Sequence, residues 1–448
     1  METRRQLRWT AAMAVAALLA LPVQAQIAVK NQGFVPFSDA PIHYRSDDLH
    51  DPVAKLQQAL ASGQVQLRHD GEHGYLKSVL DLLKISTNSQ TLVFSKTSFQ
   101  FKKITPELPR AMYFNDDVYV GQVHDGKVLE FVSFDPMQGA IFYILDEQKQ
   151  DKPKFERAEL DCTQCHVAPA TRNVPGVFVK SIFTKPTGTQ MAHSPTYITG
   201  QESPLSERWG GWYVTGTHGS QTHMGNVLAE DPENPTTIDR AAGSNVVDLA
   251  KRINTGAFLD KGSDIVAHLV LDHQTQMHNL ITLTNYRARI ATYEHAEHDK
   301  AAGTTSALTA EERKKYETPA EELVRYLLFA NEAPFTGPVR GSSDYAKDFA
   351  SIGPRDPKGR SLRDFDLNTR TFRYPCSYLI YSEAFDAIPE PAKAYVYHRL
   401  LEILTGTDQR PDYARLSAQD RRAILEILLA TKPGLPDEWR SFPIRAQK

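Results

Sequence analysis

The spacing of hydrophobic positions changes about halfway along the chain. In the first half, runs rich in β-branched and aromatic side chains alternate with turn residues, a pattern that predicts an antiparallel sheet. The four predicted strands are residues 91–101, 111–120, 127–134 and 140–145. Asp125-Gly126 and residues 135–139 separate the last three runs and are the predicted turns. Two short amphipathic helices, residues 51–60 and 75–83, are predicted before this sheet.

From residue 246 onward the apolar positions follow helical spacing. Ser263-Asp264 can cap a helix running to residue 293. One apolar stripe of this helix contains Ile265, Val266, Leu269, His273, Met277, Leu280 and Leu283. Thr318-Pro319-Ala320-Glu321 predicts a capped helix start for residues 319–328, and two more helices are predicted at residues 391–404 and 417–430. The expected fold class is therefore α+β.

Four regions follow from this pattern. They are a signal peptide at residues 1–25, an N-terminal α+β region at 26–155, an irregular binding segment at 156–240 and a mainly helical region at 241–448. The third region is rich in glycine, proline and aromatic residues, and long ordered loops of this kind commonly hold functional groups. We therefore expect the functional site in residues 156–240.

The chemistry of that segment is indicated by Cys162-Thr163-Gln164-Cys165-His166. A C-x-x-C-H sequence is typical of covalent attachment of a c-type haem. Two thiols three positions apart can each form a thioether to the porphyrin, and the adjacent imidazole can bind the iron. Cys162 and Cys165 are thus the predicted attachment residues, and His166 is the predicted proximal ligand.

Two other interpretations of the two thiols are weaker. A redox-active pair usually opens a helix, and Val167-Ala168-Pro169-Ala170-Thr171 is a poor helix start. A zinc site needs more thiolates or histidines at short spacing, and the third cysteine, Cys376, is distant in the sequence. Cys376 lies among aromatic residues, where a free cysteine is usually a small buried apolar group.

The first residues predict export. Arg4, Arg5 and Arg8 precede a short apolar run, and Val23-Gln24-Ala25 resembles a signal-peptidase site. We therefore expect a periplasmic protein, which suits haem attachment after export. No later run predicts a membrane anchor. The formal net charge of −3, without a basic block, gives no indication of nucleic-acid binding.

The opposite face of the iron decides between functions. His223 is the favoured distal ligand, with Met224 and His218 as alternatives, because glycines on both sides let this segment approach a flat ring. His273 and Met277 are competing candidates whose simpler interpretation is a place in the core. Nearby, Arg208 could pair with a haem propionate and Trp212 could cover the ring edge.

Several stretches together resemble a family of exported bacterial cytochrome c domain-containing proteins without a described reaction. The stretches are Ser95-Lys96-Thr97-Ser98-Phe99, Tyr113 to Gly121, the C-x-x-C-H, Trp209 to Gly219, and Arg373 to Tyr378. The resemblance covers most of the chain and implies one covalent haem.

The leading hypothesis is an exported monohaem cytochrome that transfers electrons to or from a redox partner protein. A haem oxidoreductase, with a small-molecule substrate at the distal iron position, is the alternative. A gas or redox sensor is a third, although no output domain is visible. The sequence does not distinguish a carrier from an enzyme.

Overall fold

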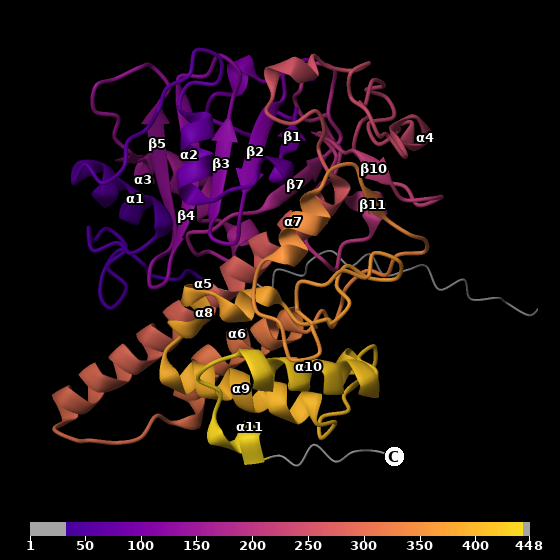
Figure 1. Ribbon diagram of the computed structural model, residues 1–448. Helices are drawn as coiled ribbons and strands as arrows, with labels where there is room; N and C mark the ends of the chain where they lie inside the picture. The colour runs from indigo at the N-terminus through magenta and orange to yellow at the C-terminus, as the bar shows by residue number, and fades with distance from the viewer. Residues whose placement is uncertain (1–32, 442–448) are drawn as a thin grey trace, which may run out of the picture.

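A computed structural model describes residues 33–441 of the chain. It confirms the α+β class, with a seven-stranded antiparallel sheet in the N-terminal half and helices in the C-terminal half (Figure 1). The strands of this sheet follow the order β6-β5-β4-β3-β2-β1-β9. Their bounds are β1 Thr91–Val93, β2 Arg110–Phe114, β3 Val118–Gln122, β4 Val128–Asp135, β5 Gly139–Asp146, β6 Glu156–Arg157 and β9 Trp212–Tyr213. The predicted signal peptide lies outside the described residues.

The turns of the sheet explain its register. β4 and β5 pair over eight residues, and the predicted turn after Asp135 is confirmed: its carboxylate accepts the N–H groups of Met137 and Gln138. The predicted strand at residues 111–120 is instead two strands, because the Asn115 side chain accepts N–H groups from Asp117 and Val118 and reverses the chain. This Asx turn is a signal that the Asn-Asp-Asp sequence carried.

The predicted strand at residues 91–101 is shorter than expected. β1 ends at Val93, because the next two N–H groups, of Phe94 and Ser95, both bond to the carbonyl of Gly211 beside β9. The binding segment thus contributes β9 to the N-terminal sheet. It also contributes short strands to two smaller sheets, with β7 Val179–Ile182 beside β8 Thr196–Thr199, and β10 Gly216–Thr217 beside β11 Arg340–Gly341.

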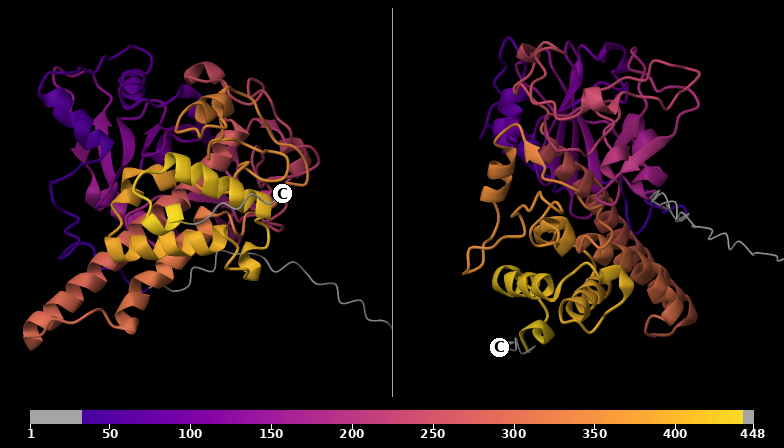
Figure 2. Two further views of the ribbon diagram at one scale, coloured as in Figure 1. Left: turned by 60° about the horizontal axis from the view of Figure 1, so that its bottom comes forward. Right: turned by 90° about the vertical axis from the view of Figure 1, so that its right-hand side faces the viewer.

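The two faces of the large sheet are covered differently. The N-terminal helices cover one face and the longest helix, α5, covers much of the other (Figures 1 and 2). The helices are α1 Pro52–Ala61, α2 Leu76–Leu83, α3 Glu159–His166, α4 Arg240–Gly243, α5 Ile265–Ala302, α6 Ala310–Leu327, α7 Tyr345–Ser351, α8 Glu383–Asp386, α9 Glu390–Leu404, α10 Ala418–Thr431 and α11 Asp437–Ser441. The far ends of α5 and α6 project as a helical hairpin (Figure 2).

One of the two predicted helix caps is confirmed and the other is wrong. Asp264 caps α5, as predicted, and Ser417 caps α10, which begins where the sequence predicts a helix. The predicted start at residue 319 is wrong: α6 begins after Thr309, which forms a capping box with Glu312, and Pro319 lies inside the helix. Among residues 33–441, no helix is long and apolar enough to cross a membrane.

Candidate functional site

The C-x-x-C-H motif lies on α3, so the binding segment is not irregular at this point. Glu159 and Asp161 occupy the first turn, where their negative charges interact favourably with the positive end of the helix dipole. The helix ends at His166, shortly before Pro169. None of its residues is buried, and Leu160 is 70% exposed. The motif is thus presented on a short surface helix that packs against β5.

His166 is held at the end of this helix by a reciprocal pair of hydrogen bonds. Its Nδ1–H donates to the carbonyl of Gly176 at 2.8 Å, and the Gly176 N–H donates back to the His166 carbonyl at 3.0 Å. The ring contacts those of Phe142 and Phe178, with centroid distances of 5.1 and 5.7 Å. With the proton on Nδ1, the lone pair is on Nε2, which is the arrangement of a metal-binding histidine.

The segment that orients His166 is anchored in the core. Asn279 of α5 accepts the N–H of Val177 and donates to its carbonyl, at 3.1 and 2.7 Å. A Cβ at Gly176 would lie 2.1 Å from the Asn279 Oδ1, so the glycine is needed for this close approach. The position of the imidazole is therefore fixed from α5 and not by α3 alone.

The two thiols of the motif suit covalent attachment. Cys162 and Cys165 are both free; Cys162 is half-buried and Cys165 is exposed. Burial, with Glu130 nearby, raises the pKa of the Cys162 thiol to about 11. Two reduced cysteines beside a histidine with a fixed Nδ1 proton form the donor set that a c-type haem uses. The residues present therefore fit this cofactor.

One group beside the motif has no signal in the linear sequence. Arg110 and Glu130, from β2 and β4, form an ion pair whose side chains are 15% and 13% exposed. The pairing of β2 with β3 and of β3 with β4 brings these residues together. Their charges reach both Cys162 and His166, where they contribute to the pKa shifts of those groups. Only the strand register reveals this neighbour.

His223 and His218, two of the predicted distal iron ligands, contact other residues than those described around His166. The ring of His223 contacts those of Trp209 and His218, with centroid distances of 5.4 and 4.7 Å. The Nδ1 of His223 accepts the Gly225 N–H, and the Nε2 of His218 accepts the Asn245 N–H. Each lone pair is thus used by a backbone donor. Burial lowers the pKa of His223 to about 3, so this imidazole is neutral.

Met224 and Trp212 also belong to this part of the fold. Met224 is buried beside Met191 and Phe183, and its Sδ accepts the Ser181 hydroxyl at 3.7 Å. Trp212 donates its indole N–H to the carbonyl of Lys180, two residues from the Phe178 ring that contacts His166. The distal ligand stays a prediction, because the contacts described for His166 are with other residues.

Arg208 has a complete set of partners inside the protein. It is 2% exposed, and its Nη1 pairs with the Asp272 carboxylate at 3.1 Å. Its Nε and Nη2 donate to the carbonyls of Ser203 and Gln201. Trp209 donates to the same oxygen of Asp272 at 3.0 Å. These contacts indicate that Arg208 organises the core around α5.

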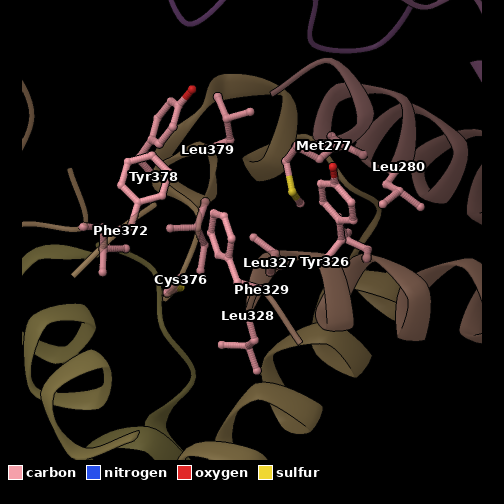
Figure 3. Packing of buried hydrophobic residues seen from close by; sticks show 14 of the residues in the cluster. Met277, Leu280, Tyr326, Leu327, Leu328, Phe329, Phe372, Cys376, Tyr378 and Leu379 are labelled. Carbon is pink, nitrogen blue, oxygen red and sulfur yellow. The ribbon is translucent and has the colours of Figure 1, made fainter. Parts of the chain in front are cut away.

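The competing candidates have core positions, in agreement with their simpler interpretation. His273 bonds through both ring nitrogens, to Gln201 at 2.6 Å and to Ser377 at 2.8 Å. Met277 and Cys376 are fully buried among aromatic and aliphatic side chains between α5, α6 and the segment after Phe372 (Figure 3). Burial raises the pKa of the Cys376 thiol to about 12, so it stays protonated.

Comparisons with known protein families, with curated proteins and with solved structures find no match to this chain. Among residues 33–441, no group of three or more His, Cys, Asp or Glu side chains is arranged to hold a metal ion. The C-x-x-C-H motif and its surroundings are therefore the features of this chain that indicate a function.

Proposed function

We propose that this chain is an exported monohaem c-type cytochrome that transfers electrons. The observation that carries the proposal is the geometry of His166, whose Nδ1–H is bonded to the Gly176 carbonyl directly after two reduced cysteines. Such a bond fixes the tautomer and ring orientation of a metal-bound imidazole. Cys162 and Cys165 would hold the porphyrin covalently, and the iron would supply one-electron chemistry.

The surface around the motif supports a role as a carrier. Cys165 is exposed, and Leu160 on the same helix is 70% exposed, so the attachment helix lies at the surface of the fold. A redox partner could therefore approach this edge closely. The predicted signal peptide at residues 1–25 supports a periplasmic location for this exchange.

Expression with a signal peptide and the c-type maturation machinery tests the proposal. The wild-type protein should gain the mass of one haem and give a pyridine haemochrome of the two-thioether type. Cys165→Ala should give the single-thioether spectrum or lose the haem. The matched control is Cys376→Ala, which changes the buried third cysteine and should keep the two-thioether spectrum. Wild-type protein without a covalent haem would refute the proposal.

A second measurement separates a carrier from an enzyme. A carrier with a sixth protein ligand should bind CO slowly in the reduced state, whereas an open iron position should bind it rapidly. His223→Ala and Met224→Leu test the predicted distal ligands, because loss of a ligand changes the spectrum and speeds CO binding. Rapid CO binding by the wild type would favour the haem oxidoreductase.

A further inference from the structure

Part of the large sheet beside α3 is only half covered. On the face that elsewhere packs under α5, the side chains near the starts of β2 and β4 and the end of β5 are partly buried. They are Arg110, Met112, Glu130, Val132 and Ile144. Met112 and Glu130 both pair with Gly121, and Glu130 also pairs with Ile144, so the group spans four neighbouring strands.

This half-covered group lies next to the C-x-x-C-H motif. Cys162, Met112 and Val132 all pack against the same core cluster. Phe142, which contacts the His166 ring, lies two residues before Ile144 on the same face of β5. A flat apolar group held through α3 would therefore meet three partly exposed apolar side chains on the sheet.

The charged members of the group have fixed positions. A Cβ at Gly121 would lie 2.7 Å from the Nε and 2.8 Å from the Cζ of Arg110, so the guanidinium lies directly over this glycine. Glu130 pairs with one edge of the guanidinium through Oε2. Its Oε1 accepts the Ser98 hydroxyl at 2.6 Å and the Gln100 amide at 2.9 Å. Glu130 thus holds Arg110 in one orientation.

The Arg110 Nε is buried and has no hydrogen-bond partner. A buried N–H without an acceptor is costly, and an acceptor supplied by a bound water, ion or ligand removes that cost. A carboxylate is the acceptor that a guanidinium binds most strongly. The orphaned donor, the half-covered apolar surface and the attachment helix therefore lie together.

We propose that Arg110 binds a carboxylate of the haem attached through α3, with Glu130 as the positioning residue for the guanidinium. The apolar side chains of Met112, Val132 and Ile144 would lie under the ring. This inference rests on the proposed function, because it requires a haem at Cys162 and Cys165. If Arg110 binds the haem in this way, the reduction potential of the iron should depend on the Arg110–Glu130 ion pair.

The sign of that dependence follows from charge. Oxidation removes one electron from the iron, so a nearby positive charge disfavours the oxidised form and a nearby negative charge favours it. Arg110→Gln should lower the potential, and Glu130→Gln should raise it. A tenfold change in the ratio of oxidised to reduced protein corresponds to about 59 mV for one electron. We expect shifts of roughly this size in opposite directions, with the double variant near the wild type.

Spectroelectrochemical titration of the purified holoprotein at several pH values measures these shifts. The potential falls as a haem carboxylate loses its proton, and Arg110→Gln should move this fall to higher pH, because the arginine no longer stabilises the carboxylate. Gly121→Ala keeps the charge but displaces the guanidinium, so it should give a smaller shift in the same direction as Arg110→Gln.

Arg399→Gln is the control, since Arg399 is a similarly buried arginine (14% exposed) paired with Glu321 in the helical half. It should leave the potential unchanged. The inference would be overturned if the reduction potential and its pH profile were the same in the wild type and in Arg110→Gln, Glu130→Gln and Gly121→Ala, even if the variants were less stable. In that case the attached haem would still support the proposed function. Absence of haem from the wild type would overturn the proposed function itself.

Discussion

Replacing Arg208 by methionine tests whether this residue serves the core or the cofactor. The Arg208–Asp272 pair is almost completely buried, with side chains 2% and 0% exposed. Removing one partner of a buried pair typically costs about 3–5 kcal/mol, because the other charge stays buried without compensation. Asp272 would keep its bonds from Thr199 and Trp209 but lose its only ionic partner among the described residues. We expect a loss in this range at pH 8.

The loss should depend on pH. Burial raises the pKa of Asp272 to about 6, and Arg208 acts in the opposite direction. At pH 5 the carboxyl is mostly protonated in both proteins, so the arginine no longer balances a charge. The penalty should then fall to about 1–3 kcal/mol, the cost of leaving the Ser203 and Gln201 carbonyls without donors. Between pH 5 and pH 8 the penalty should rise.

Urea unfolding of the holoproteins, followed by far-ultraviolet circular dichroism at pH 5 and pH 8, measures this difference. Arg208→Lys keeps the charge without the forked geometry and should fall between the methionine variant and the wild type at pH 8. A penalty below about 1 kcal/mol, or one equal at both pH values, would refute the core role. A changed reduction potential with unchanged stability would instead support the predicted propionate contact.

Two further predictions concern a glycine and a helix cap. Gly176→Ala should destabilise the protein by about 1–3 kcal/mol, because the added Cβ would collide with Asn279. It should also shift the haem spectrum, because the Gly176 carbonyl is bonded to His166. Gly337→Ala, where the added Cβ meets nothing within 4 Å, is the control for both readouts. Thr309→Ala should lower the free energy of unfolding by about 1 kcal/mol, measured by thermal or urea unfolding, whereas Thr318→Ala should leave it almost unchanged. The opposite result would mean that α6 begins at residue 319, as the sequence predicts.

Local signals predicted the elements whose contacts are close in the sequence. The turn after Asp135 and the cap at Asp264 each depend on a side chain bonding to the backbone two or three residues away. Such signals can be recognised from residue type and spacing alone. The split of residues 111–120 was missed although Asn115 carries the same type of signal, because the apolar run continues on both sides of the turn.

The predicted start of α6 is wrong because the sequence contains a second capping pattern. The sequence has two capping patterns close together, and proline is common in the first turn of a helix, which favoured the second pattern. The structure places Pro319 inside α6, where its ring is buried. The first pattern succeeds because Thr309 and Glu312 bond to each other's backbone, and His295 of α5 also contacts Glu312. That last contact depends on tertiary structure and cannot be seen in the sequence.

In the candidate site, too, the local features can be predicted from the sequence and the contacts between distant segments cannot. The C-x-x-C-H motif is local and predicts the attachment residues. The side chain that fixes the segment orienting His166, Asn279, comes from α5, and the ion pair beside the motif, Arg110–Glu130, comes from two strands. α5 also connects this support to distant parts of the chain. Two of its buried polar residues bond to distant segments: His278 to the Asp116 carbonyl in the turn between β2 and β3, and His273 to Ser377 in the C-terminal half. One helix therefore links the support of His166 to both halves of the fold, and truncating either half would remove part of that support.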